Sequence, residues 1–411
     1  LWSTGNEVPE QYTPELGIAR YLTDVVHRFD KTRPVTFGAS YPSKSAMNGT
    51  ELQVDVHGMN YAAGVYGGPH FYGEFLNKEG HEHLSGFSSE SSSTMSSRGE
   101  YFPRKFHVSS YDLNEPGWGG LPDQEFAALD RYPAICGEFV WTGFDYLGEP
   151  TPFNSDKTVL LNHAAALSKE ELKKQEEELK KIEENRPTSR SSYFGIVDLA
   201  GFPKDRYYLY RSIWNKEAET LHILPHWTWP GREGEVTPVF VYTNYPAAEL
   251  FINGKSYGKQ SKNNSSLKSR YRLMWMDAVY EPGEVKVVAY DKDGKAVAEK
   301  VVRTAGKPHH IELVSNRNEL TADGKDLAYV TVKVVDKDGN LCPTAANEIT
   351  FKVKGKGYYR AGANGDPTSL ESFQAPHMKV FSGMMTAIVS STEEPGKITL
   401  EATSKGLKKA T

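Results

Sequence analysis

Hydrophobic and polar positions follow two different patterns along the chain, and the change falls just after Trp214. Before that point, short apolar runs alternate with longer segments that have helical spacing. After it, the pattern consists of strand-like runs separated by turn residues. The first part therefore predicts α/β structure, and the second part predicts all-β structure.

Five short apolar runs in the first part are strand candidates, and they begin at residues 1, 34, 52, 84 and 134. Helical spacing predicts helices between and after them, over Pro14–Phe29, Pro69–Leu76, Asp123–Leu129 and Asp205–Trp214. Thr13 is the expected N-cap of the first helix, with Pro14 at its first position. Alternating strands and helices imply parallel strands joined by right-handed crossovers. An eight-stranded (β/α) barrel would need three further strands before Leu1.

The second part predicts two β-domains separated by a Gly306-Lys307-Pro308 linker. Hairpin turns are expected at Asn253-Gly254, Asp293-Gly294 and Asp338-Gly339. We therefore predict three domains, comprising the end of a TIM barrel and two immunoglobulin-like β-sandwiches, over residues 1–220, 221–305 and 306–411.

Composition and charge exclude some classes of protein and leave others open. A net charge of -5 without a basic stripe gives no indication of nucleic-acid binding. No apolar run approaches the roughly 20 residues of a membrane span. Cys136 and Cys342 lie too far apart to suggest a disulfide or a metal site, so the redox compartment stays open. Aromatic residues make up 12% of the chain, which suits stacking on sugars but equally suits aromatic-rich β-domains.

A highly charged segment, Ser168–Asn185, interrupts the α/β pattern. Its Lys and Glu residues recur with the spacing of opposite charges on one helix, and a thin apolar stripe runs through it. The favoured interpretation is a solvated surface helix, and the alternative is a lid over an active site.

Polar residues stand at or just past the ends of several predicted strands, namely Glu7, Tyr61, Glu90 and Trp141. Barrel enzymes place their chemistry at this end of the strands. A retaining glycosidase uses two carboxyl groups that lie about 5 to 5.5 Å apart. Glu7 and Glu90 would face a shared cavity in a barrel, although a single glutamate among 53 acidic residues is ordinarily only a solvated charge.

Four segments, taken in order, resemble glycoside hydrolase family 2 and in particular its β-galactosidases. Trp2–Glu7 resembles the acid/base motif, and Ser88–Tyr101 resembles the nucleophile strand. Gly137–Tyr146 and Tyr193–Tyr210 resemble the eighth strand and the segment that closes the barrel. The resemblance implies a retaining, exo-acting hydrolase of terminal β-galactosides, with a β-galactoside oligosaccharide or glycan as its partner.

The resemblance also assigns roles to individual residues. Glu7 would be the acid/base and Glu90 the nucleophile, with Glu90 ionised at working pH. The remaining candidates are substrate-binding residues, namely Asn6, His57, Asn60, Tyr61 and Trp141. Asn6 would contact the sugar 2-hydroxyl, Tyr61 would hydrogen-bond the nucleophile and Trp141 would floor the sugar site. On burial grounds alone, however, Trp141 is equally well a core residue and His57 a structural histidine.

Related activities remain open as alternatives, namely β-glucuronidase, β-mannosidase and a non-catalytic carbohydrate-binding fragment. By resemblance, a glucuronidase would carry an Asn-x-Lys pair where this chain has Ser192 and Phe194. Some family members bind magnesium through residues upstream of the acid/base, and those positions precede Leu1, so the residues present imply no cofactor. The chain reads as the middle of a protein, and half a barrel is expected to expose apolar edges and to lack activity alone. The resemblance suggests a periplasmic or extracellular location, and a homo-oligomer is compatible with it.

Overall fold

The structure is a computed structural model, and it describes all residues except 12, 41–47, 65–67, 69, 104–105, 154–169, 171–172, 174–176 and 178–189. The charged segment predicted as a surface helix falls almost entirely outside the described residues. The chain divides into two compact units. One consists of Leu1–Met95, Asp112–Gly143 and Asn264–Lys268, and the other of Ser96–Tyr111, Phe144–Asn263 and Ser269–Thr411.

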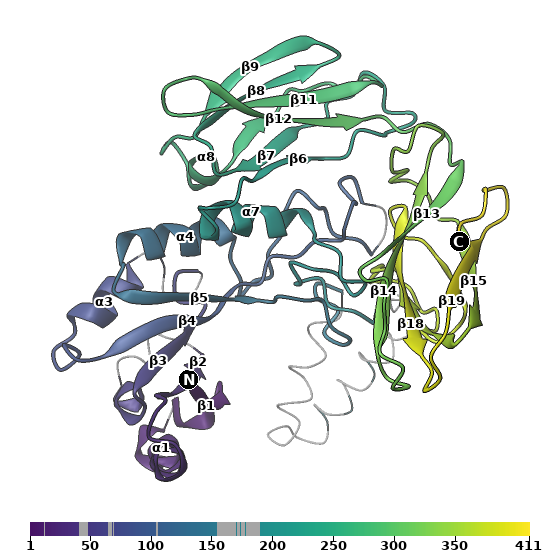
Figure 1. Cartoon of the computed structure of the whole chain (residues 1–411). Coiled ribbons are helices and arrows are strands. Elements are labelled where there is room, and N and C mark those ends of the chain that lie inside the picture. The colour runs from purple at the N-terminus through teal and green to yellow at the C-terminus, as the bar shows by residue number, and fades with distance from the viewer. Residues whose placement is uncertain are drawn as a thin grey trace. The chain divides into compact units, whose positions relative to one another are not determined.

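The first unit is built on a sheet of five parallel strands that lie side by side in sequence order (Figure 1). The strands are β1 (Trp2–Asn6), β2 (Val35–Ala39), β3 (Val56–Asn60), β4 (Ser85–Ser92) and β5 (Ile135–Trp141). All five begin within a few residues of the predicted strands, and the inner strands β2 and β3 are almost fully buried. The sheet is open, with β1 and β5 as its edges, so the predicted barrel is not closed within the described residues.

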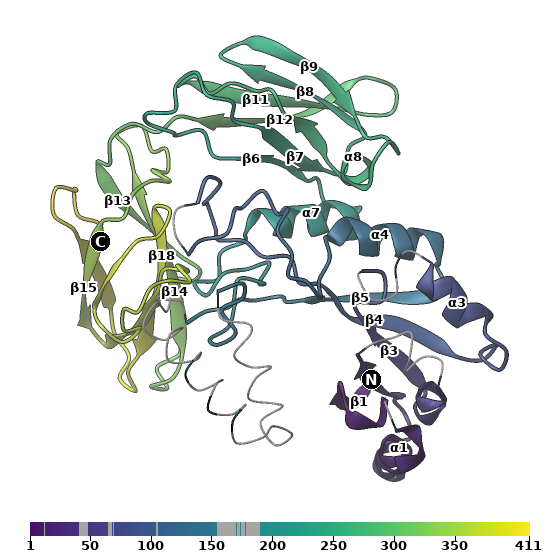
Figure 2. The same ribbon diagram turned by 180° about the vertical axis from the view of Figure 1, so that it is seen from behind.

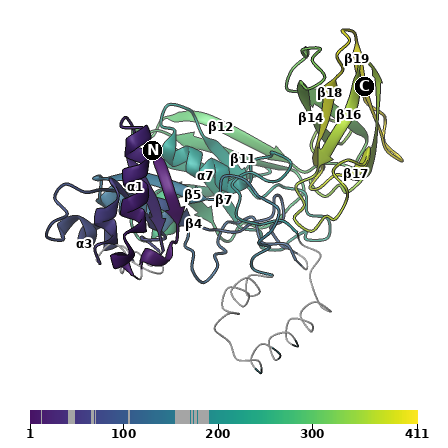
Figure 3. The same ribbon diagram turned by 90° about the horizontal axis from the view of Figure 1, so that it is seen from below.

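Helices cover the sheet through two apolar clusters. They are α1 (Ile18–Phe29), α3 (Phe71–Asn77) and α4 (Pro122–Arg131), with 3-10 turns at Pro9–Gln11, Pro14–Leu16 and Thr50–Gln53. Helix α1 contacts β1 and β2 (Figure 3), and its Ala19 packs with Phe37 of β2. Phe75 of α3 and Ala128 of α4 belong to a second cluster, which also includes Met59 of β3. These helices hold one face of the sheet and leave the carboxyl ends of its strands for polar residues.

The first helix differs from the prediction that it starts at Pro14. A 3-10 turn covers Pro14–Leu16, and Gly17 then takes a left-handed conformation with φ of 63° before α1 begins at Ile18. The Thr13 side chain makes no capping hydrogen bond. Glycine adopts positive φ without a steric penalty, so the apolar spacing continues across a break that the spacing does not reveal.

The second unit contains helix α7 (Asp205–Trp214), which matches its predicted bounds, and two pairs of antiparallel sheets (Figure 2). The first pair has the strand orders β10-β7-β6 and β12-β11-β8-β9. Its elements are β6 (Leu221–Leu224), β7 (Val239–Thr243), β8 (Ala247–Ile252), β9 (Lys255–Ser261), α8 (Leu267–Tyr271), β10 (Leu273–Trp275), β11 (Glu284–Tyr290) and β12 (Ala296–Arg303). The buried indoles of Trp227 and Trp275 lie in the core between these sheets. The turns at Asn253 and Asp293 join antiparallel neighbours, as predicted.

The second pair of sheets has the strand orders β13-β14-β18-β16 and β17-β15-β19. Its strands are β13 (His310–Ser315), β14 (Leu327–Val335), β15 (Glu348–Gly355), β16 (Gly357–Ala363), β17 (His377–Lys379), β18 (Met384–Ser391) and β19 (Ile398–Thr403). The pattern missed the two strands β16 and β17, which are short or rich in glycine and charge. No described helix is both long and apolar enough to span a membrane.

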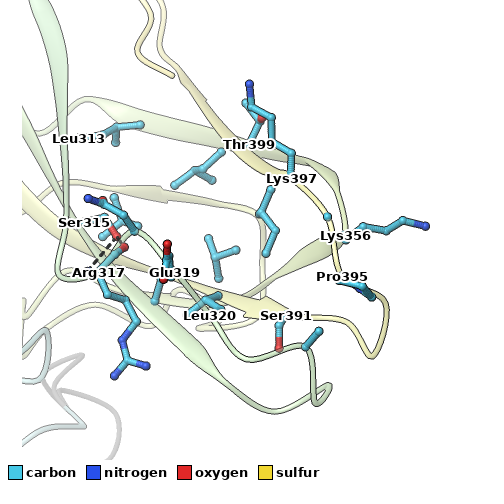
Figure 4. Close-up of a pocket in the computed structure, with 18 of the residues that line it drawn as sticks. Leu313, Ser315, Arg317, Glu319, Leu320, Lys356, Ser391, Pro395, Lys397 and Thr399 are labelled. Carbon is cyan, nitrogen blue, oxygen red and sulfur yellow. Dashed lines mark hydrogen bonds between the residues drawn. The ribbon is translucent and has the colours of Figure 1, made fainter.

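A cavity of about 900 Å³ lies at one side of this second pair of sheets (Figure 4). Leu313 of β13 and Leu400 of β19 line it, and both strands are at the edges of their sheets. Arg317, Lys356 and Lys397 are also at its rim. None of the site residues selected from the sequence lines this cavity, so the chemistry must be sought in the first unit.

Candidate active site

The carboxyl ends of β1, β3 and β4 share an irregular backbone, and the candidate residues lie there. Glu7 and Tyr61 have left-handed backbones, with φ of 49° and 55°. Such a conformation costs on the order of 1–3 kcal/mol in a residue with a side chain and is concentrated at functional sites. Bulges interrupt the register between Ser3 and Asn6 and again near Glu90. Because a bulge re-aims the side chains around it, these irregularities turn polar groups toward one another.

One group of hydrogen bonds surrounds the side-chain amide of Asn60 at the end of β3. Its Nδ2 donates to Oε1 of Glu7 and to Oδ1 of Asn6, each at 3.1 Å. Its Oδ1 accepts from the hydroxyl of Ser89 at 2.7 Å. Asn60 is fully buried, whereas Asn6 at the end of the edge strand β1 and Glu7 directly after it are exposed. The amide therefore fixes one side of an accessible carboxylate.

A second group of hydrogen bonds surrounds Glu90 on β4. The Tyr61 hydroxyl donates to Oε2 of Glu90 at 3.0 Å and accepts from the hydroxyl of Ser93 at 2.9 Å. Burial, followed by the charge of Glu90, raises the pKa of Tyr61 well above its usual value. The phenol therefore stays protonated and acts as a hydrogen-bond donor. The backbone N–H of Tyr61 also donates to the carbonyl of Glu90, at 2.7 Å.

The Glu90 carboxyl is held between opposing influences. Burial raises its pKa to about 7, and the nearby charge of Glu7 adds to the rise. Hydrogen bonds from Tyr61, Asn6 and Asn60 lower the pKa but do not outweigh burial. This differs from the expectation that Glu90 would be fully ionised, because the motif indicates its partners but not its burial. Glu7 therefore lies close enough for its charge to act on the Glu90 carboxyl.

The structure brings together Asn6, Glu7, Asn60, Tyr61 and Glu90, but His57 does not join them. Its ring stacks on Phe75 of α3, with centroids 5.7 Å apart, and meets Phe37 edge-on at 5.6 Å. Neither ring nitrogen of His57 has a hydrogen-bond partner among the described residues, and burial lowers its pKa to about 4. His57 and Asn60 are separated by an odd number of positions on one strand, so they face opposite sides of the sheet. His57 is therefore a core residue on the helix side.

Trp141 lies at the carboxyl end of β5, opposite Ser92 of β4 in the strand register. It is half-buried, which leaves part of the indole available at the strand ends. Its position at the strand ends suits a ring under a sugar.

Sequence reasoning missed three residues that support the pair, namely Gly38, Ser89 and Ser93. A Cβ on Gly38 of β2 would lie 2.5 Å from Oδ1 of Asn6 and 3.0 Å from Oδ1 of Asn60. The absence of a side chain there makes room for both amides. Ser89 and Ser93 flank the nucleophile candidate, and the serine-rich motif was the signal that could have identified them. Among the described residues, no three His, Cys, Asp or Glu side chains gather as a metal site would need.

Comparisons with known proteins bear on both parts of the chain. Residues 311–411 match the model described as glycoside hydrolase family 2 C-terminal domain 5, and residues 234–298 match a domain of unknown function. A β-galactosidase from Bacteroides ovatus is 37% identical over an alignment that covers all of this chain and 48% of that protein. The chain belongs to glycoside hydrolase family 2.

Other family 2 relatives carry different substrate names. A putative β-glucuronidase from Formosa agariphila is 30% identical over 64% of this chain and 22% of its own length. The crystal structure of a β-glycosidase from Bacteroides vulgatus superposes with a TM-score of 0.77 at 28% identity, over all of this chain and half of that one. The chain thus spans about half the length of the Bacteroides relatives that it matches.

Proposed function

We propose that this family 2 chain is the C-terminal part of a retaining, exo-acting glycosidase that cleaves terminal β-galactosides by double displacement. The observation that carries the proposal is the pairing of Glu7 and Glu90 through the amides of Asn6 and Asn60. Two neighbouring carboxyl groups at the carboxyl ends of parallel strands are the arrangement that this chemistry requires.

In the proposed mechanism, ionised Glu90 attacks the anomeric carbon while protonated Glu7 gives its proton to the leaving oxygen. The glycosyl-enzyme is then hydrolysed by a water molecule from which Glu7 takes a proton. The Tyr61 hydroxyl stabilises the negative charge of Glu90 before attack and after its release. Asn6 is the donor assigned to the sugar 2-hydroxyl, and Trp141 is the ring assigned to the floor of the sugar site.

We further propose that β1 to β5 are five strands of a (β/α)₈ barrel whose other strands come from elsewhere in the longer protein. Support comes from the parallel sequence order and from large apolar residues on the two edge strands. Phe139 of β5 is 63% exposed, and Trp2 of β1 is 46% exposed. The same proposal includes the domain boundaries predicted at residues 220 and 305. It also includes the assignment of the two β-domains after the barrel as immunoglobulin-like sandwiches.

The substrate choice is tested with chromogenic glycosides and the full-length protein. We expect kcat/KM for the β-galactoside to exceed that for the β-glucuronide and the β-mannoside by at least about 100-fold. The reason is that Ser192 and Phe194 replace the Asn-x-Lys pair that resemblance assigns to uronate recognition. A preference for the glucuronide would overturn this choice, and glycan binding without any turnover would favour a carbohydrate-binding module.

Replacement of Tyr61 tests the environment of the nucleophile. In Tyr61→Phe we expect the acidic limb of the kcat/KM profile to move to higher pH by about one unit. Glu90 reacts ionised, so activity rises as pH passes its pKa. The hydrogen bond from Tyr61 lowers that pKa, and its loss raises it further above about 7. Tyr72→Phe is the matched control, because Tyr72 donates in the same way to a buried glutamate, Glu125, at 2.5 Å. An acidic limb that moves equally in both variants would contradict the assignment of Tyr61 as the hydrogen-bond donor to the nucleophile.

A further inference from the structure

Ser89, the residue before Glu90, stands at the start of a chain of hydrogen bonds that all run toward the two carboxyl groups. Its hydroxyl donates to Oδ1 of Asn60 at 2.7 Å. A side-chain amide has one oxygen acceptor and one NH₂ donor, so a donor at the oxygen leaves the NH₂ to face the other way. That NH₂ donates to Glu7 and to Oδ1 of Asn6. Asn6 in turn lowers the pKa of Glu90.

The surroundings leave the Asn60 amide few alternatives. Asn60 is fully buried, and a Cβ on Gly38 would already lie 3.0 Å from its oxygen. A Cβ on Gly58 would lie 2.8 Å from the Ser89 hydroxyl. The two glycines, on β2 and β3, thus leave the space in which the Ser89 hydroxyl of β4 meets the Asn60 amide. Without the Ser89 donor, the amide would lose the hydrogen bond that holds its oxygen on the side away from Glu7.

We propose that Ser89 is a positioning residue that fixes the direction of the Asn60 amide and thereby orients the carboxyl group of Glu7. This inference rests on the function proposed above for Glu7. A reversed amide would present an oxygen lone pair to the carboxylate in place of an N–H donor. Such a change disfavours the ionised carboxylate. The titratable groups that face this network are Glu7 after β1, Tyr61 after β3 and Glu90 on β4.

The first test is the pH profile of kcat/KM for Ser89→Ala in the full-length protein. The side-chain amide of Asn60 lowers the pKa of Glu90, so a reversed amide should leave that pKa higher. We expect the acidic limb of the bell to move to higher pH by about one unit. A purely structural role would lower activity or stability without displacing the profile. An undisplaced bell in a folded, active Ser89→Ala variant overturns the inference.

A double-mutant cycle tests whether Ser89 acts through Asn60. Asn60→Ala alone should displace the bell, and Ser89→Ala added to it should give no further displacement. A second displacement of about the same size in the double variant would overturn the route through Asn60. If Ser89→Ala does not fold, Ser89→Cys takes its place, because a thiol is of similar size but a weak donor, and it should displace the bell in the same direction.

The matched control is Ser91→Ala on the same strand. The Ser91 hydroxyl donates to Oε2 of Glu138 at 2.6 Å, so its loss removes a comparable buried hydrogen bond without touching the carboxyl pair. The bell should stay in place in this variant, and a displacement equal to that of Ser89→Ala would overturn the inference. Failure of the full-length protein to hydrolyse any β-glycoside would contradict the proposed function. Turnover with an unmoved Ser89→Ala bell contradicts only the role of Ser89.

Discussion

Glu90→Gln in the full-length protein is expected to lower kcat for a chromogenic β-galactoside by about 10⁴-fold or more, as loss of a nucleophile does in other enzymes. The amide keeps the size and much of the hydrogen bonding of the carboxylate, so the Tyr61 hydroxyl still has an acceptor. It cannot, however, form the glycosyl-enzyme. Steady-state kinetics measure the loss. Mass spectrometry of the protein with a slow substrate measures the covalent intermediate, which the variant should lack.

Glu125→Gln is the matched control for this prediction. Glu125 of α4 is a buried glutamate whose pKa burial also raises to about 7, and it also accepts a hydrogen bond from a tyrosine. It lies on the helix side of the sheet, against Tyr72 and Ser88, and has no role in the proposed chemistry. Turnover close to that of the unmodified protein is expected from Glu125→Gln. Retention of turnover in Glu90→Gln would remove Glu90 as the nucleophile.

Glu7→Gln is expected to show a loss that depends on the leaving group. For a β-galactoside with a sugar leaving group, kcat/KM should fall by about 10³-fold, within the range that general acid catalysis contributes. For a dinitrophenyl β-galactoside, whose leaving group needs no proton, the fall in kcat/KM should be less than about tenfold. The reason is that Glu90 can then take up the glycosyl group without help from an acid. Hydrolysis of the glycosyl-enzyme still needs Glu7 as the base.

The control for Glu7 is Glu10→Gln, three residues along the chain. Glu10 is buried and its Oε1 accepts from the backbone N–H of Ala19 at 2.7 Å, a bond that a glutamine oxygen can also accept. Equal falls for both leaving groups in Glu7→Gln would contradict an acid/base role and would indicate a general loss of structure. A fall in Glu10→Gln that depends on the leaving group would also contradict the assignment of Glu7 as the acid/base.

Much of the fold could be predicted because its signals are local. Helix α7 has its predicted bounds, and β5 begins one residue from the predicted start. The break at Gly17 was not predictable from the spacing, since a left-handed glycine leaves the spacing on either side unchanged. Short polar strands such as β17 were missed because pairing with a neighbouring strand, rather than their own residues, stabilises them.

The candidate site, like the fold, was predicted only in part from the sequence. The position of Tyr61 relative to its strand shows why the sequence was insufficient. Strict alternation would place Tyr61 on the face of His57 and Met59, toward the helices. The left-handed backbone at Tyr61 breaks the alternation, and its hydroxyl instead reaches Glu90. For His57 the alternation holds, and attention to its odd spacing from Asn60 would have excluded it from the site.

By itself, the sequence determined the order of the elements, the family and the two glutamates at strand ends, because each depends on residues close together in the chain. The tertiary structure alone decided which partners those glutamates meet. Asn60 joins Glu7 from 53 residues away, and Tyr61 joins Glu90 from 29. Such contacts depend on strand register, on bulges and on the space left by Gly38, all of which arise only when neighbouring strands pair. The same pairing buries Glu90 and so sets its pKa.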